Sequence, residues 1–191
     1  ALQSQLIDSG IEEVRINYTG KVSEYDAKPL TAALLKGLLT PILKDDVNFV
    51  NAPYIASARG IKIVESKTST SEDFSSLIMC RVKSMEGENI VSGTIFGKTM
   101  PRILRINNFY LEAIPEGHIL LIRNQDVPGV IGSITSRLGA HRVNISRMQV
   151  GQEKEKKQNV IFLTTDGAVP DAVLEELRVL DNVHMARRIY L

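Results

Sequence analysis

The sequence predicts an α+β protein built from two domains. In its second half, short apolar runs and helical patterns follow the order strand–helix–strand–strand–helix–strand. This order is typical of a four-stranded antiparallel sheet with both helices on one face. The first half mixes strands and helices in an order that does not identify a topology. A Pro- and Gly-containing connection, residues 113–117, separates the halves. We therefore expect domains at residues 1–114 and 117–191.

The second half owes its clear pattern to apolar spacing. Val130, Ile134 and Leu138 recur four apart and form one helical stripe, and Val173, Leu174 and Leu177 form another. Proline fits the first helical position, because the N–H it lacks would have no partner there. The expected elements are strands at 118–123, 143–150, 159–165 and 183–190, helices that begin at Pro128 and Pro170, and a charged loop at 154–157.

The first half is also expected to contain both strands and helices. Val14 and Ile16 alternate with Arg15 and Asn17, which indicates a half-buried strand. The expected elements are strands at 11–18 and 61–64, helices at 30–43 and 53–58, a Ser/Thr-rich loop at 67–76, and hairpins joining 78–82 to 90–96 and 103–106 to 109–111. Gly60 is expected to end the second helix, and Asn107 and Asn108 suit the tight turn of the second hairpin.

Composition excludes several classes of protein. Hydrophobic residues make up 43% of the 191 residues, enough for a packed core. The net charge is +1, without the basic surplus that neutralises nucleic-acid phosphates. No apolar run approaches the roughly 20 residues of a membrane span. The single cysteine, Cys80, allows no internal disulfide or multi-cysteine metal site, and we expect it to be a buried thiol in a reducing, cytoplasmic protein.

The segment from Arg123 to Gly151 carries the candidate chemistry. Asn124 and Asp126 follow a strand and precede a helix, so Asp126 can accept hydrogen bonds from the first helical N–H groups. Gly129 lets a ligand approach the backbone, where N–H groups around Gly129 and Val130 carry the positive end of the helix dipole.

An amino acid fits this arrangement. Its carboxylate would take the N–H groups, its ammonium would take Asp126, and Asn144 would add a side-chain amide. The simpler interpretation is that Asp126 only caps its helix and Asn144 only makes a turn. Spacing alone favours the simpler interpretation.

Two sets of motifs resemble a known family. Pro128-Gly129-Val130 and Val143-Asn144-Ile145 resemble the signature of the ACT domain, an amino-acid-sensing module with a ferredoxin-like βαββαβ fold. Residues 25–31, 50–53, 59–61 and 93–97 resemble the intervening domain of long-form D-3-phosphoglycerate dehydrogenases. The resemblance extends from about Gly10 to Leu191.

The resemblance implies the C-terminal regulatory part of such an enzyme. Family members oxidise 3-phosphoglycerate with NAD, the first committed step of serine synthesis, and their paired ACT domains bind L-serine as a feedback inhibitor. The serine contacts that it implies here are Asn124, Asp126, Pro128, Gly129, Val130, Asn144 and Ile145. The implied partners are a second copy of the chain and the catalytic domains.

The chain is not expected to be an enzyme by itself. The sequence contains no Gly-x-Gly-x-x-Gly between a strand and a helix, so we expect no dinucleotide site and no cofactor in this chain. His118, His141 and His184 form no recognisable catalytic group.

The first domain offers a second candidate site. Some family members hold a phosphate-bearing effector there, and Arg102 matches one basic contact of that site. Lys98 is close in sequence. The simpler interpretation of both residues is solvated surface charge.

Two positions depart from the family pattern. Arg142 stands where many members have glycine, which implies a strained or differently shaped turn. Asn124 stands where some serine-inhibited members have a larger ring-bearing residue. The side-chain amide of Asn124 can still form hydrogen bonds with serine.

Two alternative functions remain open at this stage, and a third, RNA binding, is disfavoured, since no nucleic-acid partner is expected. The strand order also suits an RNA-binding sheet, although Phe162 is the only aromatic residue in its central strands. The chain can instead belong to an iron–sulfur L-serine dehydratase, with its cluster elsewhere. It can also be an ACT module that mediates assembly and senses no ligand.

Overall fold

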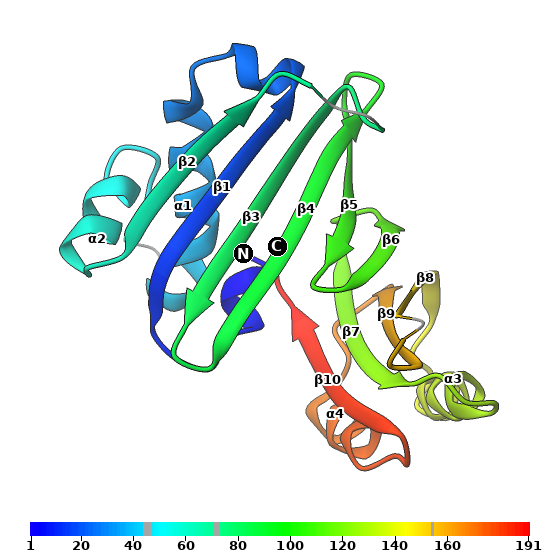
Figure 1. Cartoon of the computed structure of the whole chain (residues 1–191). Coiled ribbons are helices and arrows are strands. Elements are labelled where there is room, and N and C mark those ends of the chain that lie inside the picture. The colour runs from blue at the N-terminus through cyan, green and yellow to red at the C-terminus, as the bar shows by residue number, and fades with distance from the viewer. Residues whose placement is uncertain (44–46, 71–72, 154) are drawn as a thin grey trace. The chain divides into compact units, whose positions relative to one another are not determined.

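The computed structural model describes residues 1–43, 47–70, 73–153 and 155–191, and in this part the chain forms two compact units (Figure 1). The units are Ala1–Asn107 and Asn108–Leu191, so the division falls before the connection at residues 113–117. The division falls there because β6 (Phe109–Ala113) belongs to the second unit. It pairs with β8 (Ile145–Glu153) of that unit through Tyr110 and Gln152. None of the described helices is long and apolar enough to span a membrane.

The first unit is a sheet of five described strands with helices against one face (Figure 1). Its elements are η1 (Gln3–Gln5), β1 (Ile11–Gly20), η2 (Lys21–Glu24), α1 (Ala27–Leu43), α2 (Ala52–Ala58), β2 (Lys62–Thr68), β3 (Ser76–Ser84), β4 (Gly87–Phe96) and β5 (Met100–Ile106). The strand order is β5-β4-β3-β1-β2. Only β1 and β2 run parallel among these pairs, and α1 and α2 supply the crossover that a parallel pair needs.

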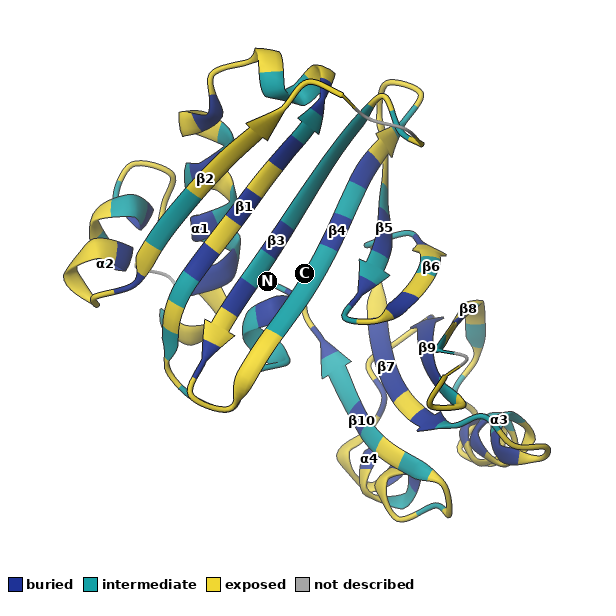
Figure 2. Ribbon diagram, viewed as in Figure 1, coloured by how far each residue is buried: buried dark blue, intermediate teal, exposed yellow. Residues whose placement is uncertain are grey.

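The core of this unit lies between the helices and β1 and β3 (Figure 2). Ile16 on β1 and Leu35 on α1 are fully buried. Cys80 is buried as predicted, and burial raises the pKa of its thiol to about 12, which keeps the thiol neutral. The side-chain amide of Gln3 donates to the carbonyls of Cys80 (2.7 Å) and Asn89 (3.0 Å) and so ties η1 to the sheet.

Most elements predicted for this unit are present. The Ser/Thr-rich loop was predicted wrongly at its start, because Lys67 and Thr68 extend β2 by pairing with Tyr18 and Thr19. Residues 71 and 72 of that loop lie outside the described residues. Asn107 adopts φ +53, the left-handed conformation expected for a tight turn after β5.

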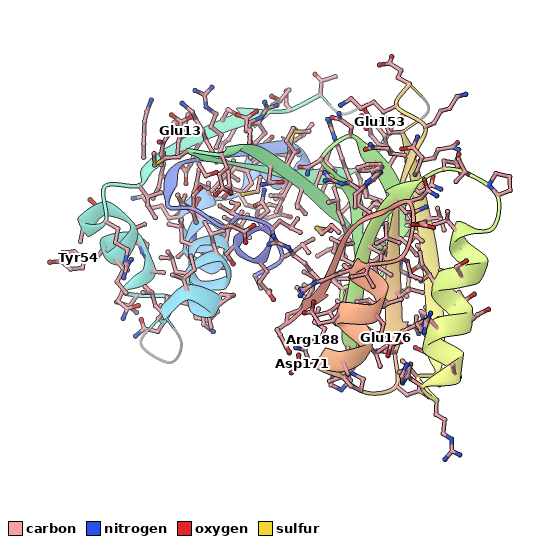
Figure 3. All side chains as sticks on the ribbon, turned by 90° about the horizontal axis from the view of Figure 1, so that it is seen from below. Glu13, Tyr54, Glu153, Asp171, Glu176 and Arg188 are labelled. Atoms are coloured by element: carbon pink, nitrogen blue, oxygen red, sulfur yellow. The ribbon has the colours of Figure 1, made fainter. Side chains whose placement is uncertain are left out.

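The second unit has the predicted βαββαβ order. Its elements after β6 are β7 (His118–Gln125), α3 (Val130–Ala140), β8, β9 (Gln158–Thr165), α4 (Asp171–Arg178) and β10 (Val183–Ile189). The strand order is β10-β7-β9-β8, every pair of these strands is antiparallel, and α3 and α4 cover one face (Figures 1 and 3). This arrangement is ferredoxin-like, so the predicted α+β class is confirmed.

The predicted helical stripes form the core of the second unit. Val130, Ile134 and Leu138 of α3 are buried, as are Val173, Leu174 and Leu177 of α4. They pack on one face of the sheet, against Leu120 and Ile122 of β7 and Ile161 and Leu163 of β9. Residues with the same parity along these strands therefore point toward the helices.

The predicted starts of the two helices were wrong by one or two residues. The N-cap of α3 is Gly129 with φ +92, and Pro128 lies in the turn before it. Proline cannot adopt a positive φ, so the reversal needed glycine at the cap. Pro170 is likewise the N-cap of α4 and not its first helical residue. In the predicted charged loop, residues 155–157 form a turn, and residue 154 lies outside the described residues.

The C-terminus of α3 ends in a left-handed cap formed by Arg142, with φ +57. The N–H of Arg142 donates to the carbonyl of Gly139 (2.9 Å), and that of Val143 donates to the carbonyl of Leu138 (2.9 Å). These two bonds define a Schellman motif, in which glycine is the usual capping residue. Arg142 therefore occupies a strained backbone position.

We predict that Arg142→Gly stabilises the fold. Relief of the left-handed strain should raise the free energy of unfolding by about 1 kcal/mol. The matched control is Ala140→Gly, two residues earlier, where glycine should destabilise the helix by roughly 0.5–1 kcal/mol. Chemical denaturation measures both changes, and equal effects of the two substitutions would contradict this account.

An ion-paired group ties α3 to α4. Glu176 Oε2 accepts one hydrogen bond from Arg137 Nη1 (2.9 Å) and lies 3.0 Å from His141 Nε2. The hydrogen bond from His141, followed by the charges of His141 and Arg137, lowers the pKa of Glu176 from its ordinary value. At the other end of α4, Asp171 pairs with Arg188 of β10 (Figure 3).

The lowered pKa of Glu176 predicts a pH-dependent contribution to stability. A carboxylate whose pKa is depressed by folding stabilises above its unfolded pKa, ordinarily 4.5, and this contribution is lost as the pH falls through the folded pKa. Glu176→Gln should therefore unfold at lower temperature than wild type at pH 7, with the difference shrinking below pH 4.5. Thermal unfolding across pH checks this, and a constant difference would contradict it.

Candidate functional site

The candidate site lies at the end of the second unit's sheet where β7 passes into α3. Two backbone hydrogen bonds fix this connection. The N–H of Gln125 donates to the carbonyl of Asn182 (2.8 Å), and the N–H of Asp126 donates to the carbonyl of Lys157 (2.7 Å). In Figure 3, Glu153 marks this end of the sheet, and Glu176 lies beside the opposite end of α3.

The carboxylate of Asp126 is held by two side-chain amides. Asn159 donates to Oδ1 at 2.9 Å, and Gln152 donates to Oδ2. The prediction that Asp126 caps α3 was wrong, since the N-terminus of α3 has no side-chain capping bond. The strand register explains the difference, because it brings the amides of β8 and β9 to the carboxylate.

Three amide side chains form a row beneath Asp126, and we call this set the amide row: Asn124 on β7, Asn159 on β9 and Gln152 on β8. Asn159 is the register partner of both Asn124 and Gln152. Directly opposed residues point to the same face of a sheet, and Asn124 shares the helix-facing parity of Leu120 and Ile122. The amide row therefore faces the first turn of α3.

Two members of the amide row are buried. Asn124 is fully buried and Asn159 is 3% exposed. Asn124 donates to the carbonyl of Gln125 at 2.7 Å. Within the described residues, the side-chain oxygens of Asn124 and Asn159 accept no hydrogen bond.

The start of α3 completes this end of the site. The first N–H groups of a helix lack intrahelical partners and carry the positive end of its dipole. Gly129 is exposed, and a Cβ built there would meet no atom within 4 Å, so the backbone is open to approach. Pro128 is exposed beside it, whereas the side chain of Val130 is buried in the core.

Asn144 and Ile145 lie at the opposite end of the sheet. Ile145 pairs with Thr165, while Gln125 pairs with Gln158, so the length of β9 separates the two ends. Seven residues of strand span roughly 23 Å. Asn144 donates to Asp166 Oδ2 at 2.6 Å. One copy of the chain therefore does not bring Asn144 to Asp126.

Arg102 and Lys98 lie in the first unit. Arg102 is on β5, with its guanidinium carbon 5.5 Å from the centre of the Phe96 ring and Nη1 donating to the carbonyl of Pro101 at 2.9 Å. Lys98 is exposed in the turn between β4 and β5. The anion site suggested for these residues stays a prediction.

Sequence reasoning missed Gln152 and Asn159. Neither residue belongs to a recognisable motif, and both lie within strands, Gln152 near the end of β8 and Asn159 near the start of β9. Their importance comes from the register between β7, β9 and β8, which a single sequence does not reveal. Among the described residues, no group of His, Cys, Asp and Glu side chains is suited to a metal ion.

Comparison with known proteins matches each half of the chain to a family model. Residues 1–107 match the D-3-phosphoglycerate dehydrogenase intervening domain, and residues 118–182 match the ACT domain. A D-3-phosphoglycerate dehydrogenase from Methanocaldococcus jannaschii is 35% identical over 179 residues, 94% of this chain and 34% of the relative. The enzyme of the same name from Archaeoglobus fulgidus is 36% identical over 185 residues, 95% of this chain and 35% of the relative.

The chain belongs to the D-3-phosphoglycerate dehydrogenase family. It spans about a third of the length of these relatives. A solved homoserine dehydrogenase from Thiobacillus denitrificans is 17% identical, with a TM-score of 0.31 over 59% of this chain and 33% of its own. That similarity is too low to inform the fold.

The family models place the two candidate sites in different domains. The intervening-domain model ends at residue 107, where the first unit ends, and contains Arg102 and Lys98. The ACT model contains β7, α3, β8, β9 and α4, and with them Asp126 and the amide row.

Proposed function

We propose that this chain is the regulatory region of a D-3-phosphoglycerate dehydrogenase and binds L-serine through its ACT domain for feedback control. The observation that carries the proposal is the Asp126 carboxylate, held by two amides beside the open N-terminus of α3. In this proposal the chain is no enzyme by itself. NAD and 3-phosphoglycerate bind to catalytic domains of the parent protein, outside this chain.

The site offers complementary groups for the two charges of an amino acid. Asp126 accepts hydrogen bonds from the ammonium, since a carboxylate has about four acceptor positions and only two are used by Asn159 and Gln152. The N–H groups around Gly129 and Val130 would bind the ligand carboxylate, with the helix dipole behind them, and that of Val130 would give up its long hydrogen bond to the carbonyl of Val127 (3.5 Å). Pro128 and Gly129 are exposed and leave this approach open.

A second copy of the chain would supply Asn144. Two copies related by a two-fold axis beside β8 and α3 have these elements antiparallel, which brings Asn144 and Ile145 of one copy to the Asp126 end of the other. Met148 and Val150 support this arrangement. They are the register partners of core residues Leu163 and Ile161, so they lie on the helix face of β8, yet they are 42% and 40% exposed.

This exposed apolar surface also favours a second candidate function. An ACT domain that only mediates assembly would use the apolar surface at Met148 and Val150 and would bind no ligand. Because β6 pairs with β8 at Gln152, we place the contact between copies on α3 and the helix face of β8. Serine binding distinguishes the two candidates.

We predict that titration calorimetry detects saturable binding of L-serine to the wild-type chain. Asp126→Ala removes a charged acceptor and should weaken binding at least roughly tenfold, the loss expected for a charge-assisted hydrogen bond. D-serine and glycine should bind more weakly than L-serine.

The matched control is Glu175→Ala, which removes an exposed carboxylate from α4 and should leave serine affinity unchanged. Unchanged affinity in Asp126→Ala would refute the proposed site. Absence of any serine binding to the wild-type chain would leave assembly as the function of the ACT domain.

A further inference from the structure

Two buried acceptors in the ACT domain lack donors. The side-chain oxygens of Asn124 and Asn159 are buried and accept no hydrogen bond from the described residues. Leaving a buried polar atom unbonded is unfavourable, so such atoms in a native fold call for an explanation. Both oxygens belong to the amide row, at the same end of the sheet as Asp126.

Rotation of the amide groups does not remove the problem. Asn124 donates to a backbone carbonyl, that of Gln125, and Asn159 donates to the carboxylate of Asp126. A carbonyl and an ionised carboxylate can only accept, so the amide nitrogens must face them. The partners therefore fix both oxygens in their present positions, and each oxygen needs a donor that these neighbours do not supply.

The acceptors lie close together. Asn124 and Asn159 are opposed on neighbouring strands, where Cβ atoms are about 5 Å apart. Asp126 contacts Asn159 directly, at 2.9 Å. Two amide oxygens and a carboxylate therefore lie near one another at the Asp126 end of the sheet, and because both amide oxygens are covered, a ligand reaches them only when neighbouring side chains move aside.

An ammonium group matches this set of acceptors. It carries three N–H donors and a positive charge, and it has no acceptor of its own. A hydroxyl group has a single donor and fills at most one of the three positions. A carboxylate has no donor, and it would be repelled by Asp126.

We propose that Asn159, together with Asn124, is a specificity-determining residue that selects a primary ammonium group, with Asp126 supplying the charge. The inference rests on the proposed function, because it requires that a small ligand binds at this end of the ACT domain. It adds a residue outside the sequence motifs, Asn159, and it assigns the buried amide oxygens to the ligand's ammonium and not to its carboxylate.

The strongest test compares Asn159→Leu with Gln152→Leu. Each substitution removes one amide donor from Asp126, but only Asn159→Leu removes a buried acceptor. The ligands are L-serine and L-glycerate, which differ in carrying an ammonium or a hydroxyl on the α-carbon. Titration calorimetry on the full chain measures all four affinities and those of the wild type.

The wild-type chain should prefer L-serine over L-glycerate by at least roughly tenfold, and Asn159→Leu should reduce this ratio to about threefold or less. Gln152→Leu should keep the wild-type ratio. A purely structural role for Asn159 would weaken both ligands equally and leave the ratio unchanged, and that result would overturn the proposal.

Two further measurements keep the test informative. Asn159→Leu should unfold at a temperature close to that of wild type, because the lost hydrogen bond to Asp126 is offset by removal of an unbonded buried oxygen. If it fails to fold, Asn159→Ala replaces it in the same comparison. An unchanged ligand ratio in Asn159→Ala would likewise overturn the proposal.

Failure of the proposed function can be told apart from failure of this inference. If the wild-type chain does not bind L-serine, thermal unfolding is repeated with glycine, L-alanine, L-threonine and ethanolamine. An amine that stabilises wild type and Gln152→Leu but not Asn159→Leu would support ammonium selection with another ligand. If no amine does so, the inference is refuted.

Discussion

The register of β7, β9 and β8 is the constraint on which the ACT domain's candidate site depends. Side chains alternate along each strand, so one register places Leu120, Ile122 and Asn124 on the same face. Pairing with β9 then sets Asn124 opposite Asn159, and pairing with β8 sets Asn159 opposite Gln152. A slip by one residue would turn the apolar residues and the amide row away from α3 together. The core and the polar site are therefore specified by the same pairing.

This shared register also explains why one copy of the chain offers only part of the proposed amino-acid site. Along β7 and β9, the side chains that face α3 change from apolar core residues to the buried amides. Asn159 donates to Asp126 and holds it above them. The strand direction that makes this arrangement also sends Asn144 to the far end of the sheet, where it bonds Asp166. A ligand contact that needs both Asp126 and Asn144 is a contact between two copies. In the proposed function, assembly and ligand binding would then be coupled, since ligand favours the paired state only as far as it binds that state better.

Apolar periodicity made much of the fold predictable. Stripes such as Val130, Ile134 and Leu138 identify buried helix faces, and alternation in β1 identifies a strand, because both reflect local geometry. The helix starts at Pro128 and Pro170 were misplaced, since the cap geometry depends on the path of the preceding loop. Asn124 and Asp126 stand out in the sequence because they lie at the C-terminal end of a strand, just before a helix. Gln152 and Asn159 do not, because their role arises from strand pairing between distant segments. Sequence also suggested that Asp126 caps α3, and only the structure shows that neighbouring strands hold it instead.

The most direct test of a site shared between two copies is complementation between Asp126→Ala and Asn144→Ala. The two variants are produced with different affinity tags, and the mixed pair is purified and titrated with L-serine. In the mixed pair one site carries both substitutions and the other carries neither. The account predicts that each variant alone binds L-serine weakly, whereas the mixed pair regains wild-type affinity at one of its two sites. A mixed pair that binds no better than either variant alone would contradict it.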